Sequence, residues 1–250
     1  MSTKTILITG ASSGLGAEMA RQFADLGYDL ALCARRTDRL KELQTEIGGK
    51  HPDRRVEVRA LDVNDDEAVF EVFRAFKADF GTIDRVVVNA GLGKGAPLGT
   101  GRFDANKQTA VTNFVAAIAQ AEAAMEIFRE QGSGHLVLIS SMSAVRGMPK
   151  AGTVYAATKA GIATLAEGLR MEMLGKPIKI STIYPGYIRS EMNERVKNAP
   201  FMVDTETGVR AMVEAIEKEK GHASVPALPW VPLGQVIKHA PLPVVKKFLG

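Results

Sequence analysis

The sequence predicts a single α/β domain in which a doubly wound, central parallel sheet is flanked by helices. Two observations carry this prediction. Apolar runs of strand length alternate with amphipathic segments along the chain, and several runs, such as 86–88 and 136–139, are continuously hydrophobic. Strands that are apolar on both faces belong to parallel sheets covered by helices. Because no linker or repeat occurs before about residue 223, residues 1–250 are assigned to one domain.

The strands and helices are expected to alternate, joined by right-handed crossovers. The expected strands are 4–9, 29–34, 55–61, 84–89, 134–140 and 178–184. The expected helices are 14–27, 38–47, 65–79, 103–130, 153–174 and 205–218. The helical segments are amphipathic, as helices that cover one face of a sheet need to be.

The C-terminal segment 223–250 differs from the rest of the chain. It is apolar, carries Lys246 near its end and contains five prolines: Pro226, Pro229, Pro232, Pro241 and Pro243. Proline excludes a long regular helix there, so we expect a C-terminal cap over the sheet edge or a neighbouring subunit. The alternatives are a substrate lid and a peripheral membrane contact, because exposed apolar surface beside lysines suits either.

Composition argues against several classes of protein. Hydrophobic residues make up 46% and charged residues 24%, as in ordinary globular proteins. The net charge is +4 without a dominant Lys/Arg block, so we expect no nucleic-acid partner. The only cysteine, Cys33, excludes an intrachain disulfide and fits a cytoplasmic location. No signal-peptide pattern and no stretch of 18 apolar residues occurs, so no membrane span is expected.

Metal and esterase chemistry have no support in the sequence. The histidines are scattered without the spacing of metal ligands, at His51, His135, His222 and His239. No Gly-x-Ser-x-Gly segment is present, which argues against an esterase. We therefore predict no metal site.

A glycine-rich turn follows the first expected strand. The segment TGASSGLG, residues 9–16, lies between the apolar run 5–8 and an amphipathic helix. Glycines at this position let a pyrophosphate approach the backbone and the positive end of the next helix. The pattern predicts a Rossmann-type nucleotide site formed by Gly10, Ser12, Ser13, Gly14, Leu15 and Gly16.

The residues that end the second strand indicate which nucleotide binds. A site for NAD has Asp or Glu there to bind the ribose hydroxyls. This chain has Arg35 and Arg36 instead. Guanidinium groups bind a 2′-phosphate through charge-assisted hydrogen bonds, so the sequence favours NADP(H). The alternative is that both arginines belong to a solvated surface turn.

Three side chains suggest acid–base chemistry at the same edge of the sheet. Tyr155 and Lys159 stand four positions apart in YAATK, on one face of the expected helix. A phenol titrates near pH ~10, and a neighbouring ammonium favours its anion. Ser141 ends the fifth strand, where its hydroxyl can donate to a carbonyl oxygen as charge develops. Each residue alone has a structural explanation, but together they predict a catalytic site.

These motifs, in this order, resemble the short-chain dehydrogenase/reductase family in its form of about 250 residues. The resemblance covers nearly the whole chain, from TGASSGLG to PGYIRS at 185–190. It implies a catalytic tetrad of Asn113, Ser141, Tyr155 and Lys159.

The resemblance also implies a role for each member of the tetrad. Tyr155 exchanges a proton with the substrate oxygen, and Lys159 lowers the pKa of the phenol and holds the nicotinamide ribose. Ser141 polarises the carbonyl, and Asn113 anchors a water in a proton relay to Lys159. Ser143 is a rival for Ser141, because Ser141 and Tyr155 are one position further apart than is usual in the family.

Further cofactor contacts are implied by the same resemblance. Asp62 and Val63 are expected at the adenine, and the segment 89–91 along the adenosine. The remaining positions are expected at the nicotinamide, with Tyr155 and Lys159. In full, the added cofactor-binding residues are Asp62, Val63, Asn89, Ala90, Gly91, Pro185, Gly186, Ile188 and Ser190.

The expected activity is an NADP(H)-dependent interconversion of a carbonyl and a secondary alcohol. The expected substrate loop, 187–204, offers an apolar, adaptable surface, which favours a hydrophobic small-molecule substrate. Its apolar residues are Met192, Val196, Phe201 and Met202. The alternative function is a non-catalytic, NADP(H)-binding regulatory or scaffold protein with the same fold. Small residues in helices 103–130 and 153–174 fit a homodimer or homotetramer, as family members commonly form.

Overall fold

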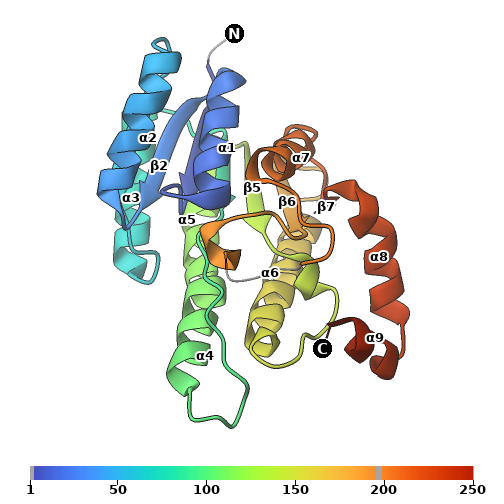
Figure 1. Cartoon of the computed structure of the whole chain (residues 1–250). Coiled ribbons are helices and arrows are strands. Elements are labelled where there is room, and N and C mark those ends of the chain that lie inside the picture. Colours follow the sequence, from blue (N-terminus) through green and yellow to red (C-terminus); the bar gives the residue numbers. More distant parts are fainter. Residues whose placement is uncertain (1–2, 195–198, 250) are drawn as a thin grey trace.

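The computed structural model describes residues 3–194 and 199–249, and in them seven parallel strands form one sheet (Figure 1). The spatial order is β3-β2-β1-β4-β5-β6-β7. The strands are β1 (Thr5–Thr9), β2 (Asp29–Ala34), β3 (Val56–Ala60), β4 (Arg85–Val88), β5 (Gly134–Ile139), β6 (Ile178–Pro185) and β7 (His222–Val225). The predicted fold class is confirmed, and β7 is a strand that the sequence analysis did not anticipate.

Helices cover both faces of the sheet. They are α1 (Gly14–Asp25), α2 (Thr37–Lys50), α3 (Asp66–Phe80), α4 (Phe103–Ala110), α5 (Ala116–Gln131), α6 (Gly152–Glu172), α7 (Thr205–Glu217), α8 (Ala227–His239) and α9 (Leu242–Leu249). The buried side chains of α1, α2 and α7 share one core cluster with the sheet, and those of α3, α5 and α6 share the other. Because both faces are covered, the central strands β1, β2, β4 and β5 are almost entirely buried.

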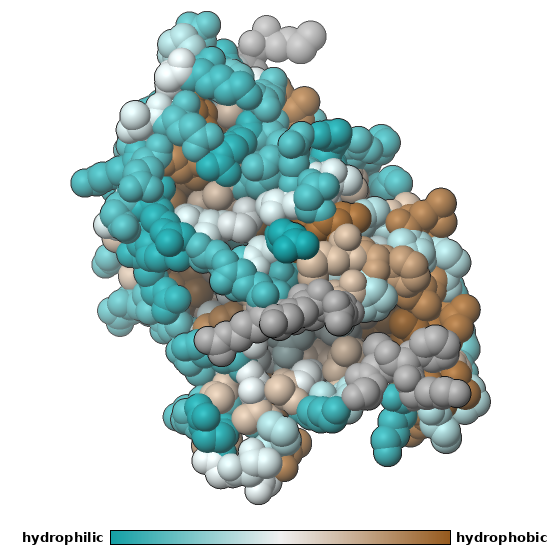
Figure 2. All heavy atoms as spheres, in the orientation of Figure 1, coloured by the Kyte–Doolittle hydropathy of each residue, from teal (hydrophilic) through white to brown (hydrophobic). Residues whose placement is uncertain are grey.

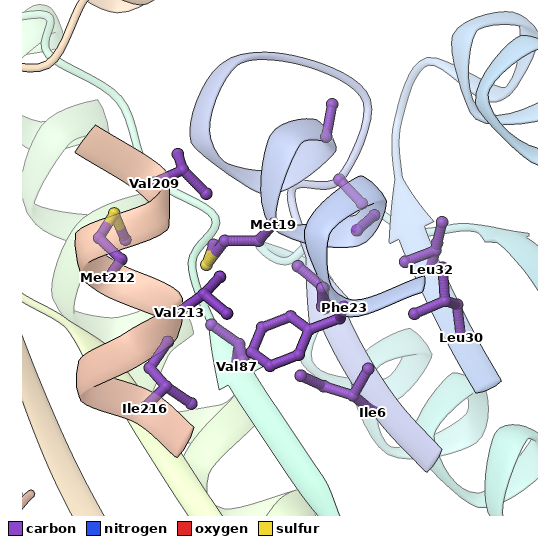
Figure 3. Close-up of a cluster of buried hydrophobic side chains, with 14 of the residues drawn as sticks. Ile6, Met19, Phe23, Leu30, Leu32, Val87, Val209, Met212, Val213 and Ile216 are labelled. Atoms are coloured by element: carbon purple, nitrogen blue, oxygen red, sulfur yellow. The ribbon is translucent and has the colours of Figure 1, made fainter. Parts of the chain in front are cut away.

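The core beneath α1 and α7 shows how sequence spacing produces this packing. In α7, Val209, Met212, Val213 and Ile216 recur at helical spacing and form one buried stripe. Figure 3 shows this stripe facing Phe23 of α1, whose ring lies against the sheet. Burying a side chain of this size stabilises the fold by roughly 1.5–3 kcal/mol. The stripe therefore holds α7 on the sheet beside α1.

The strand order reverses beside β1, which pairs with β2 on one side and β4 on the other. The chain proceeds from β1 through β2 to β3, and then returns to β4 and continues to β7 on the opposite side. Crossovers that leave a sheet in opposite directions open a crevice beyond the carboxyl ends of the strands. The TGASSGLG turn follows β1, so the topology places it at this crevice.

The expected helix 103–130 is interrupted. Residues Val111–Val115 form a π-helical turn between α4 and α5, and this turn carries Asn113. Turns of this kind widen a helix locally and are frequent at functional sites. The small residues of α5 face inward, with Ala117, Ala121 and Ala124 buried in the core.

As expected, no long regular helix forms in the described part of the C-terminal segment, although its prolines do not exclude short helices. The segment forms β7, α8 and α9. Helical geometry starts after Leu228, which is non-helical, so Pro229 and Pro232 fall in the first turn of α8. The first N–H groups of a helix have no intrahelical acceptor, and proline is tolerated there.

The outer side of α8 remains apolar. Leu228, Val231 and Val236 are exposed, and Figure 2 shows apolar residues gathered along the side where α8 lies in Figure 1. The helix packs beside β7 at the end of the sheet. The cap, lid and membrane roles of this segment stay predictions. Within the described residues, no helix is both long enough and apolar enough to cross a membrane.

Candidate active site

A cavity of about 460 Å³ opens at the carboxyl ends of the strands. Its wall combines the glycine turn after β1 with the segments that follow the next five strands. All the residues predicted to bind the cofactor line it: Gly10, Ser12, Ser13, Gly14, Leu15, Gly16, Arg35, Arg36, Asp62, Val63, Asn89, Ala90, Gly91, Tyr155, Lys159, Pro185, Gly186, Ile188 and Ser190. Folding therefore brings together residues that are far apart in the sequence.

The glycine turn has no room for larger residues. Gly10 has φ +65°, and a Cβ added at Gly16 would lie 2.3 Å from the Gly10 carbonyl oxygen. The turn is joined to the end of β4, where the Asn89 amide donates to the carbonyl oxygen of Thr9 at 2.9 Å. The Thr9 hydroxyl accepts from the backbone N–H groups of Asn89 and Ala90. These bonds fix the turn against the sheet.

The first turn of α1 lines the cavity. Ser13 precedes the helix but makes no side-chain cap, since its hydroxyl accepts from Arg36 instead. The backbone N–H groups that start a helix have no intrahelical partner and carry partial positive charge. This arrangement can bind a phosphate group.

Arg36 extends the anion-binding side of the cavity. It follows β2, and its guanidinium also donates to Ser12 Oγ at 3.3 Å. Arg35 lines the cavity as well and is more exposed. The two arginines therefore lie where the adenosine ribose of a dinucleotide is expected. That they favour NADP(H) over NAD(H) stays a prediction.

Tyr155 and Ser141 meet at the opposite end of the cavity. Burial raises the pKa of the Tyr155 phenol, and a hydrogen bond with Ser141 opposes that increase. Ser141 Oγ also accepts from the backbone N–H of Ser143 at 3.2 Å. The Ser143 hydroxyl is buried and has no hydrogen bond to any described residue. The geometry thus places Ser141, and not Ser143, beside the phenol.

Lys159 lies one helical turn below Tyr155, buried in α6. Its ammonium is 5.8 Å from the centroid of the Tyr155 ring and donates to the Ile139 carbonyl oxygen at 2.9 Å. Burial lowers the pKa of Lys159 to about 8. The groups that shift the pKa of Tyr155 are its burial, Ser141 and Tyr187, so the lowering of the phenol pKa by Lys159 stays a prediction.

Asn113 is fully buried behind this pair and does not line the cavity. Its amide holds the backbone of Leu92, accepting from the N–H and donating to the carbonyl oxygen, both at 2.8 Å. A Cβ added at Gly91 would lie 3.2 Å from Asn113 Oδ1 and 3.6 Å from Lys159 Nζ. Asn113 and Lys159 therefore lie on either side of Gly91. The proton relay from Lys159 through a water held by Asn113 stays a prediction.

An aromatic cluster packs beside Gly186, which lines the cavity. Trp230 of α8 packs so tightly on Gly186 that an added Cβ would lie 2.0 Å from its indole nitrogen. The Trp230 ring centroid is 5.8 Å from that of Tyr187 and 6.1 Å from that of Phe201. The expected loop 187–204 thus contributes Tyr187 and Phe201 to this cluster and Ile188 and Met192 to the cavity lining. Its residues 195–198, Val196 among them, lie outside the described chain.

Sequence reasoning missed several residues of the cavity. The wall also contains Asn64, Thr112 and Glu191. Asn64 donates to the Asp62 carboxylate at 2.9 Å and accepts from the Thr112 hydroxyl at the same distance. Each stands next to a predicted residue, but no spacing or composition signal distinguishes it from an ordinary polar residue.

Comparison with known proteins identifies the family. Residues 4–200 match the short chain dehydrogenase family, so the chain belongs to this family. An uncharacterised oxidoreductase of Mycobacterium tuberculosis (strain H37Rv) is 53% identical over 243 residues, which cover 97% of this chain and 96% of that protein. The protein is thus an oxidoreductase of a family that uses nicotinamide cofactors and acts on small molecules.

Solved structures show the same fold with nucleotide bound. A short-chain dehydrogenase of Sphingobium yanoikuyae in complex with NADPH is 26% identical and covers 93% of each chain with a TM-score of 0.81. An alcohol dehydrogenase of Thermococcus sibiricus complexed with 5-hydroxy-NADP is 25% identical, with a TM-score of 0.80, covering 91% of this chain and 97% of that one.

Proposed function

We propose that this protein reduces a hydrophobic carbonyl compound to a secondary alcohol with NADPH, and catalyses the reverse reaction with NADP. The observation that carries the proposal is that the Ser141 hydroxyl and the Tyr155 phenol lie together in the cavity that also contains the glycine turn and Arg36. The two hydroxyls at one end of the cavity suit a reacting carbonyl. The hydrogen-bond donors at the other end suit the phosphate groups of a dinucleotide.

The residues around the glycine turn fit such a cofactor. The close approach at Gly16 leaves a backbone cradle beside the uncapped start of α1, which suits the pyrophosphate. Arg36 would hold the 2′-phosphate, and Lys159 the nicotinamide ribose. When bound, the nicotinamide supplies the hydride that adds to the carbonyl carbon.

The protein's own groups complete the reduction with one proton. The raised pKa of Tyr155 keeps the phenol protonated at neutral pH, which is the form that can donate. The phenol gives its proton to the substrate oxygen as negative charge develops there. Ser141 donates a hydrogen bond to the same oxygen. Hydride at carbon and proton at oxygen together give the alcohol and leave a phenolate to be reprotonated.

The aromatic cluster beside the cavity supports a hydrophobic substrate. Trp230, Tyr187 and Phe201 lie together beside Gly186, and Met192 adds an adaptable apolar side chain to the cavity. Ketones with aliphatic or aromatic substituents are expected to turn over, and small polar sugars are not. A substrate panel in which only the sugars react would contradict this part of the proposal.

The cofactor is tested by titrating the purified protein with NADPH and NADH while following nicotinamide fluorescence. Tighter binding of NADPH supports the role of Arg36. Equal affinities would mean that the arginines are ordinary surface charges, and binding of neither nucleotide would contradict the proposed function.

Catalysis is tested with Tyr155→Phe. Loss of a positioned acid lowers turnover by about 100-fold or more, while the NADPH affinity is expected to stay within about twofold. Tyr184→Phe is the matched control, since Tyr184 lies in β6 and does not line the cavity. Full turnover in Tyr155→Phe would refute the assigned role of the phenol.

The homo-oligomer stays a prediction, supported by apolar residues exposed near the ends of the two long helices. Val115 and Ile118 are exposed near the start of α5, and Met171 and Leu174 near the end of α6. Light scattering decides between a monomer and an oligomer.

A further inference from the structure

The arginines at the end of β2 already bind a carboxylate of this chain. Glu191 lies just beyond β6, in the short turn Glu191–Asn193. One of its oxygens is 3.0 Å from Arg36 Nη1, and the other accepts from Arg39 Nη1. The two arginines and the glutamate are separated by about 150 positions in sequence, so folding alone brings them together.

In this arrangement Glu191 accepts hydrogen bonds from the same guanidinium groups that would bind a 2′-phosphate. Arg36 directs its other nitrogens to Ser12 and Ser13 of the glycine turn. The guanidinium, the two hydroxyls and Arg39 thus form an anion cradle, and the Glu191 carboxylate occupies its open side. A carboxylate and a phosphate both accept charge-assisted hydrogen bonds from arginine, so one can replace the other.

The electrostatic surroundings agree with this geometry. Hydrogen bonds from Arg39 and then Arg36, with their positive charge, hold the pKa of Glu191 below its usual range. Glu191 is therefore ionised at neutral pH and repels a second anion at the same arginines. Its side chain is 44% exposed, so the carboxylate can turn into solvent at little cost.

We propose that Glu191 is a specificity-determining residue that competes with the 2′-phosphate of NADP(H) for Arg36 and Arg39. NADP(H) has to displace this carboxylate, whereas NAD(H), which lacks the 2′-phosphate, leaves it in place. Glu191 therefore makes the preference for NADP(H) over NAD(H) smaller than the arginines alone would make it. This inference rests on the proposed function, because it requires a dinucleotide in the cavity.

The test compares Glu191→Gln with the wild type at low ionic strength, by nucleotide fluorescence titration of the full chain. Glu191→Gln is expected to bind NADPH about fivefold to tenfold more tightly, because the competing charge is gone. Its NADH affinity is expected to stay unchanged. Added salt should shrink the gain, since it screens exposed charges.

Glu194→Gln is the matched control, since Glu194 is an exposed carboxylate three positions further along the same segment. It should change neither affinity. An equal gain for NADPH and NADH in Glu191→Gln would overturn the proposal, because the loop would then act on access to the cavity. A weaker NADH affinity with unchanged NADPH affinity would also overturn it, since Glu191 would then bind the ribose of NAD(H).

A further variant separates this inference from the proposed function. Arg36→Ala is expected to weaken NADPH binding and to reduce the effect of Glu191→Gln in the double variant, since only the pair with Arg39 remains. If Arg36→Ala loses the NADPH preference while Glu191→Gln binds like the wild type, the proposed function stands and the inference fails. If the wild type binds neither nucleotide, both fail.

Discussion

At the scale of single residues, Lys159 shows that the candidate site is built at the expense of stability. Its ammonium is buried in α6 with one hydrogen bond to the Ile139 carbonyl oxygen, and burial lowers its pKa from 10.5 to about 8. The unfolded chain therefore binds more protons than the native protein between about pH 8 and 10.5, and stability rises with pH across that window. Below pH 8 the native protein carries the full cost of a buried charge.

Lys159→Met is expected to be more stable than the wild type at pH 7, by about 2 kcal/mol. The pKa shift corresponds to about 3 kcal/mol, from which the lost hydrogen bond to Ile139 subtracts about 1 kcal/mol. Denaturant unfolding measures the difference, which should shrink as the pH approaches 10.5. Lys107→Met, at an exposed position of α4, should leave stability nearly unchanged. A Lys159→Met protein less stable than the wild type would contradict this account.

At the scale of elements, the β1–α1 turn joins the core to the cavity. The turn is bonded to the end of β4 through Asn89 and to the end of β2 through Arg36. The carbonyl oxygen of Gly10 lies close to where a Cβ of residue 16 would be, so only glycine fits at position 16. This close approach lets α1 start directly after β1. A change in this turn therefore acts on the sheet and on the cavity together.

Gly16→Ala should destabilise the fold and weaken nucleotide binding. The new methyl group would meet a backbone oxygen at 2.3 Å, and overpacking of this kind costs about 1–3 kcal/mol. We expect NADPH affinity to fall about tenfold or more, which is the effect of a loss of about 1.4 kcal/mol. Gly168→Ala is the control, because Gly168 is an exposed residue of α6 with open space around it, and alanine there favours the helix. If Gly16→Ala binds NADPH like the wild type, the turn does not hold the pyrophosphate.

At the scale of the whole molecule, one buried polar network joins three strands and α7. Arg85 of β4 donates to His135 Nδ1 of β5 at 2.9 Å, and His135 Nε2 lies 2.7 Å from Ser181 Oγ of β6. Arg85 also pairs with Glu217 at the end of α7. Burial, and then the charge of Arg85, lower the pKa of His135 to about 3. His135 is therefore neutral in the native protein, accepting from Arg85 and donating to Ser181.

This network predicts acid sensitivity. Between about pH 6.5 and 3 the unfolded chain binds a proton at His135 that the native protein does not, so stability falls as the pH falls. From pH 7 to pH 5, His135 alone should reduce the free energy of unfolding by about 2 kcal/mol. In His135→Gln, which does not titrate, that part of the decrease should disappear. His222→Gln, at the exposed start of β7, should keep the wild-type pH profile, and an unchanged profile in His135→Gln would contradict the assignment.

Features that depend on neighbouring residues could be predicted from the amino-acid pattern alone. Continuous apolar runs and helical periodicity predicted six of the seven strands and the doubly wound sheet, because both patterns are local. The glycine spacing in 9–16 and the four-residue separation of Tyr155 and Lys159 are local as well, so the sequence identified the candidate site. β7 is short and partly polar, and it lacks a strand signal of its own.

The folded structure was needed for the features that depend on distant contacts. It placed Ser141 rather than Ser143 at Tyr155, because the chain turns sharply after β5. It put Glu191 on Arg36, and Trp230 on Gly186, across long stretches of sequence. No residue pattern encodes such pairs, because two side chains meet only after the packing of whole helices on the sheet has fixed where each segment lies.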